Sequence, residues 1–262
     1  MADTLGSRAA LADAIVALAH EAGHAIMEVY NSDFAVTQKG DSSPVTEADV
    51  RGEKIILAGL ARLDPGTVIV AEEAVAEGGL PPGDPASWPR FWLVDPLDGT
   101  KEFVARNGQF TVNIALVENG VPTMGVVYAP AIGETYVGFG PGTARRALGD
   151  GPLEPISVRA PAADGLVVVA SRSHRDSRTD EFLAKLKIKD LETAGSSLKF
   201  CIIAAGNADL YPRLGTTMEW DTAAGHAVVL AAGGRVDTLD GAPMLYAKPG
   251  FTNPHFVVRG AG

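Results

Sequence analysis

Residues 91–100, with the sequence FWLVDPLDGT, join an apolar segment to a turn that carries two carboxylates. The run Phe91–Val94 is typical of a buried strand. The proline of the turn stiffens the bend, and its glycine permits a positive φ. Three oxygen donors can therefore converge on one point, namely the side chains of Asp95 and Asp98 and the carbonyl group of Leu97. Such oxygens are the ligands that Mg²⁺ and Mn²⁺ prefer, although the same residues are also typical of an ordinary surface turn.

Three further acidic clusters lie at the ends of predicted elements. Glu72 and Glu73 close a short apolar strand, Asp49 lies where one helix begins, and Asp221 lies where another begins. Each cluster alone is equally typical of a solvated strand end or a helix cap. Together, they predict one site at the carboxyl ends of strands. A bound metal would balance the negative charge there and could activate a water for phosphoryl transfer.

The rest of the chain predicts a layered α/β or α+β protein, because strands gather in its first half and alternate with helices in its second half. A turn-rich segment at 140–155 divides the chain into an N-terminal α+β half (1–140) with the metal-binding loops and a C-terminal α/β half (141–262) with the substrate-binding segments. We expect one continuous catalytic unit. Predicted helices span 7–30, 47–62, 176–187, 195–205 and 221–232. Predicted strands span 67–72, 91–94, 110–117, 121–128, 135–139, 166–170, 209–212 and 235–238, and 77–90 is a long loop.

Composition excludes several classes of protein. The 262 residues contain 22 Lys and Arg against 32 Asp and Glu, a net charge of −10, and 46% are hydrophobic, which excludes general disorder. The acidic balance argues against binding a nucleic-acid polymer but leaves room for a small anionic substrate. A single cysteine excludes an intrachain disulfide. With neither a signal peptide nor a membrane-spanning run in the sequence, we expect a cytoplasmic protein.

Other chemistries have weaker support. The sequence has no Gly-x-Ser-x-Gly elbow and no P-loop, which argues against a serine hydrolase and an ATPase-type enzyme. His20 and His24 share a helix face but lack a third metal ligand. We expect Cys201 and His226 to pack in the core.

Three motifs, in order, resemble the signature of the Mg²⁺-dependent, lithium-sensitive phosphatases of the inositol monophosphatase superfamily. They are the acidic pair Glu72–Glu73, WLVDPLDGT at 92–100 and WDTAAG at 220–225. Further stretches resemble the CysQ branch, the 3′(2′),5′-bisphosphate nucleotidases, at 43–49, 98–103, 110–116, 171–174, 195–201, 210–213 and 220–227. The resemblance is loose before about residue 43 and after about residue 227.

The resemblance implies an α-β-α-β-α layered fold and a phosphomonoesterase that hydrolyses 3′-phosphoadenosine 5′-phosphate to AMP and phosphate. It also implies two or three Mg²⁺ ions, with Mn²⁺ as an alternative. Carried over by motif, the metal ligands are Glu72, Asp95, the Leu97 carbonyl, Asp98 and Asp221. Asp49 and Thr100 are implied to orient the attacking water and form the catalytic set with Glu72. The implied phosphate- and substrate-binding residues are Gly99, Thr100, Lys101, His174, Ser196, Lys199, Arg213 and Asp221.

Alternatives remain open. An inositol monophosphatase or a fructose-1,6-bisphosphatase-like enzyme of broader range would use the same metals, but the stretches 171–174 and 195–200 match the nucleotidase branch better. A catalytically silent Mg²⁺-binding regulator would not need all the acidic motif residues to be intact. A homodimer and peripheral association with the inner membrane face are left open. The loop 77–90 is longer and richer in proline than the branch suggests, and its role is open.

Overall fold

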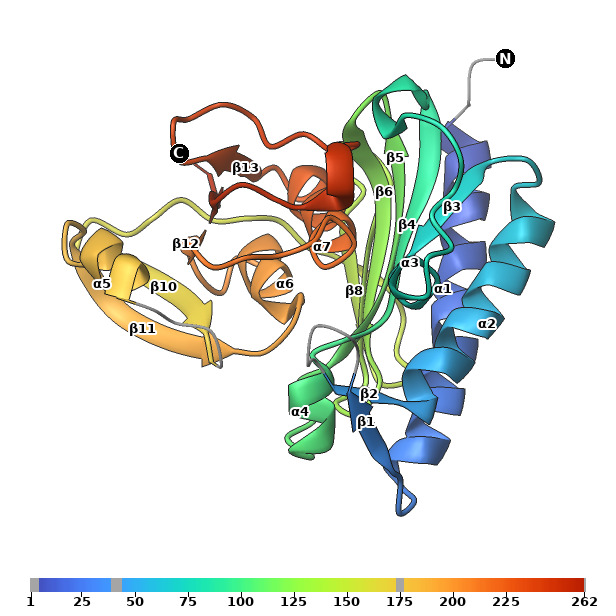
Figure 1. The fold of residues 1–262 in the computed structure, drawn as a ribbon. Helices are drawn as coiled ribbons and strands as arrows, with labels where there is room; N and C mark the ends of the chain where they lie inside the picture. The colour runs from blue at the N-terminus through green and yellow to red at the C-terminus, as the bar shows by residue number, and fades with distance from the viewer. Residues whose placement is uncertain (1–4, 39–43, 173–176, 262) are drawn as a thin grey trace.

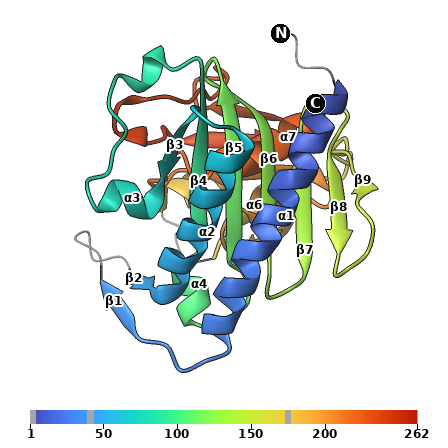
Figure 2. The ribbon, with the colours of Figure 1, turned by 90° about the vertical axis from the view of Figure 1, so that its right-hand side faces the viewer.

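The computed structural model describes residues 5–38, 44–172 and 177–261 and has five layers (Figure 1). Helices α1 (Leu5–Tyr30) and α2 (Glu47–Leu63) cover one face of a seven-stranded sheet, as Figure 2 shows from that side. Helices α6 (Leu198–Ala204) and α7 (Ala223–Ala231) lie between this sheet and a five-stranded sheet. Helix α5 (Ser177–Leu183) packs on the outer face of the smaller sheet. This order confirms the predicted α-β-α-β-α fold.

The seven-stranded sheet has the order β3-β4-β5-β6-β7-β8-β9. Only β3 and β4 run parallel, and every other neighbouring pair is antiparallel. Asn119 and Gly120 both have positive φ, 51° and 76°, between β5 and β6, which is the conformation of the tight hairpin turn that Asn-Gly predicts. The strands are β3 (Val68–Ala71), β4 (Arg90–Asp98), β5 (Thr111–Glu118), β6 (Val121–Ala129), β7 (Glu134–Gly138), β8 (Arg145–Leu148) and β9 (Glu154–Pro155).

The five-stranded sheet has the order β11-β10-β12-β14-β13. Strand β10 is parallel to both of its neighbours, whereas β14 pairs antiparallel with β12 and β13. Its strands are β10 (Leu166–Ser171), β11 (Ile188–Ala194), β12 (Leu210–Arg213), β13 (Arg235–Thr238) and β14 (Phe256–Arg259). The remaining elements are the pair β1 (Val36–Gln38) and β2 (Pro44–Thr46), the short helices α3 (Glu72–Ala76) and α4 (Thr100–Val104), and the 3₁₀ turns Pro85–Ser87 and Pro249–Phe251.

Strand β4 lies in the core with both faces covered, which explains its unbroken apolar sequence. Phe91 and Leu93 belong to the hydrophobic cluster between the two sheets, while Trp92 and Val94 belong to the cluster beneath α1 and α2. Because side chains alternate along a strand, Asp95 continues the series of Phe91 and Leu93 and faces the layer of α6 and α7. The sheet thus directs the first carboxylate of the turn into the middle of the molecule.

Several predicted boundaries were wrong. The helix expected at 176–187 ends at Leu183, and the edge strand β11 follows it. Strand β4 continues beyond Val94 to Asp98, because Asp95 and Asp98 still pair with β5. The turn-rich segment 140–155 contains β8 and β9, which extend the large sheet. The division into halves 1–140 and 141–262 stays a prediction.

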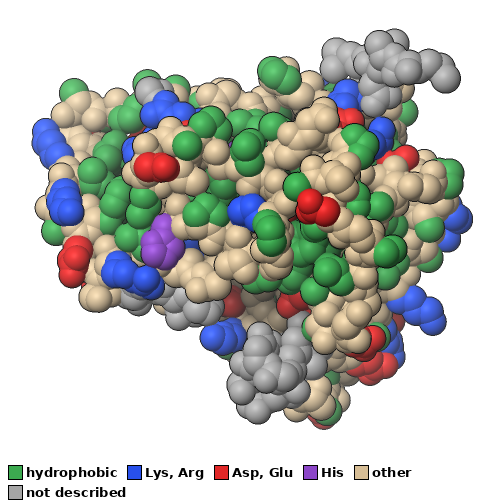
Figure 3. Space-filling model, turned by 45° about the horizontal axis from the view of Figure 1, so that its top comes forward, with side chains coloured by type: hydrophobic (Ala, Val, Ile, Leu, Met, Phe, Trp, Pro, Cys, Tyr) green, Lys and Arg blue, Asp and Glu red, His purple; other side chains and the backbone are tan. Residues whose placement is uncertain are grey.

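The distribution of surface charge and the hydrophobicity of the helices are relevant to the partners that the protein can bind. On the face drawn in Figure 3, basic and acidic side chains are interspersed among hydrophobic and neutral ones. Within residues 5–38, 44–172 and 177–261, none of the helices combines the length and the apolar character needed to cross a membrane.

Candidate active site

Three carboxylates meet where β3, β4 and the start of α7 come together. Ligand oxygens of Glu72, Asp95 and Asp221 all lie within 4.8 Å of one another. The parallel register of β3 and β4 pairs Ala71 with Val94, so Glu72, directly after β3, lies beside Asp95 of β4. The sheet therefore creates the first half of this acidic triad, and the loop before α7 adds the third member.

The triad is electrostatically unfavourable unless a cation neutralises it. Burial raises the pKa of Asp221 well above its usual range, and the nearby carboxylates of Asp98 and Glu72 raise it further. Burial likewise raises the pKa of Asp98, against the opposing effects of the Lys199 ammonium group and a hydrogen bond from Ser197. Converging oxygen donors with a shared negative charge fit a hard divalent cation such as Mg²⁺ or Mn²⁺.

Asp98 lies beside the triad and is held by two residues that the sequence analysis did not single out. The Ser197 hydroxyl lies 2.9 Å from Asp98 Oδ2 and 2.6 Å from the Asp221 carbonyl oxygen, and its single proton serves one of them at a time. The Asn113 amide donates to the Ser197 oxygen at 2.9 Å. Residues of β4, of β5, of the loop before α7 and of the turn before α6 are thereby linked at the site.

Asp49 confirms its predicted role as a helix cap and lies beside Thr100, while its role in orienting water stays a prediction. One oxygen accepts the Thr46 backbone N–H at 2.8 Å, and the Thr46 hydroxyl accepts the Ala48 N–H, which confirms the capping box at the start of α2. The other oxygen lies 3.3 Å from the Thr100 hydroxyl, which is also 3.3 Å from the Leu97 carbonyl oxygen. The structure thus brings together Asp49, Thr100 and the Leu97 carbonyl group.

Gly99 is required by its backbone and its surroundings. Its φ is 90°, and a Cβ atom there would lie 3.3 Å from the Gln109 carbonyl oxygen, a Glu102 carboxylate oxygen and the Ser196 Cβ. Because an added side chain would be both strained and crowded, glycine keeps the backbone beside Thr100 accessible.

One cavity brings the predicted phosphate- and substrate-binding residues together with Glu72, Asp95 and Asp98. His174 is the exception, because it lies outside the described residues. Lys101, Ser196, Lys199 and Arg213 all line it. The other lining residues are Glu72, Asp95, Leu97, Asp98, Gly99, Thr100, Glu102, Ser171, Phe200, Tyr211, Thr216, Thr217, Asp221 and Thr222.

The two buried cations of the cavity still have donors available. The Lys199 ammonium donates to the carbonyl oxygens of Ser196 at 2.5 Å and Ala194 at 3.3 Å, which leaves one of its three N–H groups. Burial lowers the pKa of Lys199 to about 8. Arg213 donates through Nη2 to the Thr216 carbonyl oxygen at 3.1 Å, and its buried Nε has no hydrogen-bond partner among the described residues. The Ser196 hydroxyl is likewise buried without a partner.

Glu53 is a supporting residue that the sequence analysis missed. Its carboxylate accepts the backbone N–H groups of Glu73 at 2.8 Å and Ala74 at 2.9 Å, at the start of the short helix α3. Because that helix begins with Glu72, the contact fixes the backbone of a triad residue. The available signal was spacing, since Glu53 lies one helical turn after Asp49 on α2. Cys201 and His226 are buried, which confirms the predicted packing role.

Comparison with known proteins agrees with these motifs. Residues 8–258 match the inositol monophosphatase family. A protein of Escherichia coli (strain K12) named 3′(2′),5′-bisphosphate nucleotidase CysQ is 46% identical over 255 residues, with 94% of this chain and 98% of the relative covered. The crystal structure of CysQ from Bacteroides thetaiotaomicron matches with a TM-score of 0.81 and 37% identity, covering 97% of this chain and 98% of that chain. An inositol monophosphatase from Anabaena (Nostoc) sp. PCC 7120 matches with a TM-score of 0.75 and 28% identity, covering 96% and 91%.

Proposed function

The chain belongs to the inositol monophosphatase family, and from that premise we propose that it is a 3′(2′),5′-bisphosphate nucleotidase that hydrolyses 3′-phosphoadenosine 5′-phosphate to AMP and phosphate. One observation carries the choice of substrate. The cavity contains the acidic triad together with two buried cationic side chains, Lys199 and Arg213. A substrate with two phosphate groups can use both features, whereas a monophosphate uses only the first.

Glu72, Asp95, the Leu97 carbonyl group, Asp98 and Asp221 would hold the metal, which we propose to be two or three Mg²⁺ ions. When bound, Mg²⁺ would acidify a water molecule and stabilise the charge that develops on the phosphoryl and leaving oxygens. The triad supports this assignment because its members have only oxygen donors and share a negative charge.

The protein's own groups would orient the nucleophile. The Thr100 hydroxyl can donate to Asp49 and accept from a water on its cavity side, so the pair can fix the water's orientation. Asp49 is almost completely buried and held by its cap contacts, so it is a rigid acceptor. Attack of the water oxygen on phosphorus breaks the bond to the ribose oxygen, which takes a proton as it leaves.

Lys199 and Arg213 would bind the phosphate group that is not cleaved. The third N–H of Lys199 and the Nε of Arg213 have no hydrogen-bond acceptor among the described residues, and both are donors of the kind that bind phosphate oxygens. Backbone N–H groups near Gly99 and Thr100, with Lys101 and Ser196, would contact the phosphate that is cleaved. His174 belongs to the proposed substrate-binding set on its motif alone.

The experiment is a comparison of kcat/KM for 3′-phosphoadenosine 5′-phosphate, inositol monophosphate and fructose 1,6-bisphosphate at saturating Mg²⁺. The proposal expects the nucleotide to be the best substrate. A preference for inositol monophosphate would replace it with the alternative activity. Absence of phosphate release from all three would favour a silent metal-binding protein.

We further propose that the enzyme acts in the cytoplasm on small phosphorylated molecules, without a nucleic-acid polymer as partner and without stable membrane insertion. Sedimentation would test the alternative of a homodimer. Membrane fractionation would test peripheral association with the inner membrane face.

A further inference from the structure

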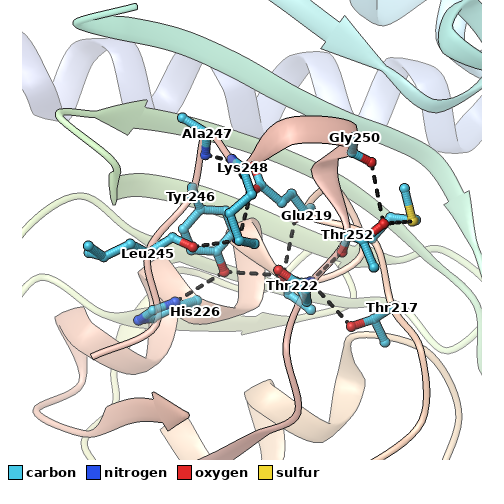
Figure 4. Close-up of polar contacts among 12 residues, drawn as sticks. Thr217, Glu219, Thr222, His226, Leu245, Tyr246, Ala247, Lys248, Gly250 and Thr252 are labelled. Atoms are coloured by element: carbon cyan, nitrogen blue, oxygen red, sulfur yellow. Dashed lines mark hydrogen bonds and ion pairs between the residues drawn. The ribbon is translucent and has the colours of Figure 1, made fainter. Parts of the chain in front are cut away.

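We propose that Asn253 is a positioning residue for the metal ligand Asp221, and that residues 245–253, here called the C-terminal strap, are part of the metal site. The proposal rests on the assignment of Asp221 to the metal. It concerns a part of the chain in which the family motifs are loose. Figure 4 shows the strap, including Leu245, Tyr246 and Lys248, against Glu219 and Thr222 of the loop that carries Asp221.

The first contact passes through one peptide group. The Met218 backbone N–H donates to Asp221 Oδ2 at 2.8 Å. The carbonyl oxygen of that same peptide group belongs to Thr217, and it accepts the Asn253 backbone N–H at 2.9 Å. The peptide is thus held between Asn253 and the Asp221 carboxylate. Hydrogen bonds in such a chain strengthen one another and fix the orientation of the group at its end.

The Asn253 side chain holds the same loop at further points. Its amide nitrogen lies 2.7 Å from the Met218 carbonyl oxygen, 3.0 Å from the Thr222 hydroxyl and 3.2 Å from the Thr217 hydroxyl. These acceptors lie on both sides of Asp221 in the sequence. Since Asn253 is buried, water is poorly placed to replace the contacts if the side chain is removed.

The neighbouring side chains form further hydrogen bonds that join the strap to the loop. Burial lowers the pKa of His226 to about 3, so its ring is neutral at neutral pH, with Nδ1 placed 3.1 Å from the Tyr246 hydroxyl. The Tyr246 hydroxyl donates to the Thr222 hydroxyl at 3.1 Å, which in turn donates to the Glu219 carbonyl oxygen at 3.2 Å (Figure 4). The Asn253 amide nitrogen can only donate, so Thr222 is the acceptor in the contact between these two residues.

Glu219 anchors the other end of the strap. Its buried carboxylate accepts the backbone N–H groups of Ala247 and Lys248, both at 2.9 Å, and forms an ion pair with the Lys248 ammonium at 2.6 Å (Figure 4). The loop 217–222 is therefore tied to the strap at Glu219 and at Asn253. Asp221 lies between Glu219 and Thr222 in the loop, so the two ties fix the backbone that places its carboxylate near Glu72 and Asp95.

The test measures binding of Mn²⁺ alone to the full-length protein, from the electron paramagnetic resonance signal of free Mn²⁺. The variants are Asn253→Ala and Thr222→Val. The control, Thr143→Val, makes the same change as the second variant at the opposite end of α7. There the Thr143 hydroxyl accepts the Phe139 N–H and donates to the Gly140 carbonyl oxygen, at 2.8 and 2.7 Å. Melting temperatures in EDTA monitor folding without metal.

We expect Asn253→Ala and Thr222→Val each to bind Mn²⁺ about 10-fold more weakly, in line with the loss of a group that orients a metal ligand. The control should stay within about 2-fold, whatever its melting temperature. If Asn253→Ala melts below the assay temperature, Thr222→Val decides the question. Mn²⁺ affinities of the folded variants within about 2-fold of the unsubstituted protein overturn the positioning role. Failure of the unsubstituted protein to bind Mn²⁺ overturns the metal site itself, and with it this role.

Discussion

Arg213→Ala separates recognition of the second phosphate from general function of the metal site. We predict that it lowers kcat/KM for 3′-phosphoadenosine 5′-phosphate about 10- to 150-fold, because a charge-assisted hydrogen bond contributes about 1.5–3 kcal/mol and 1.36 kcal/mol corresponds to a factor of ten. Inositol monophosphate has no second phosphate, so its kcat/KM should fall much less.

The magnitude follows from the contacts of the side chain. Only 8% of the surface of Arg213 is exposed, and its Nε is buried without a partner among the described residues. The contact with the Thr216 carbonyl oxygen uses one of five N–H donors. The change also removes the contact with Thr216, in the loop leading to Asp221. Loss of this contact would lower kcat/KM for both substrates, so its size can be measured with inositol monophosphate. The ratio of the two losses isolates the phosphate contact.

Two variants complete the assay. Arg213→Lys keeps the charge but loses the planar fork of donors, so its effect on the nucleotide should be intermediate. Arg145→Ala makes the same change at an exposed position of β8 and should leave both substrates unaffected. Equal losses on the two substrates for Arg213→Ala would refute the assignment, because loss of the structural contact with Thr216 would affect both alike.

Asp98→Asn keeps the shape of the side chain but removes a charge that a hard cation needs, so kcat should fall at least about 10³-fold; a near-normal kcat at saturating Mg²⁺ would remove Asp98 from the metal ligands. Asp49→Asn and Thr100→Ala should each lower kcat more than they raise KM, because orientation of water acts in the transition state. If Asp49→Asn instead costs only about 1 kcal/mol of stability and leaves kcat unchanged, its role is limited to the helix cap. The pKa of His226 is lowered to about 3 in the folded protein from its ordinary 6.5. Below about pH 6.5 the unfolded chain therefore binds a proton that the folded protein does not, and the free energy of unfolding decreases as the pH is lowered. Urea titrations at pH 7 and pH 5 should therefore show the unsubstituted protein losing about 2 kcal/mol more than His226→Gln, and equal losses would contradict the assignment.

The sequence indicates which acidic residues lie at the ends of elements, because their position directly after an apolar run is a local property. Glu72 and Asp95 each follow an apolar run, and parallel pairing of those runs makes them neighbours. The five layers follow from the family resemblance, whereas the apolar periodicity alone predicted only a layered α/β or α+β protein. Strand β11 was missed because its residues are largely exposed at a sheet edge, where little hydrophobic pattern is needed.

Asn113 and Asn253 could not be predicted as supporting residues because their partners are distant in sequence. Asn113 contacts Ser197 across 84 positions, and Asn253 contacts Thr222 across 31. Polar residues of this kind carry no periodic signal, and each could equally lie on the surface. Only the folded arrangement of β5, α6 and the C-terminal strap shows that they meet at the carboxylates.

The most direct test of the proposed activity is to incubate 3′-phosphoadenosine 5′-phosphate with the purified protein and to identify the products with and without Mg²⁺. The proposed function predicts one phosphate released per nucleotide, AMP with its 5′-phosphate retained as the sole nucleotide product, and no reaction in EDTA. Formation of adenosine 3′-phosphate, or phosphate release that persists in EDTA, would contradict it.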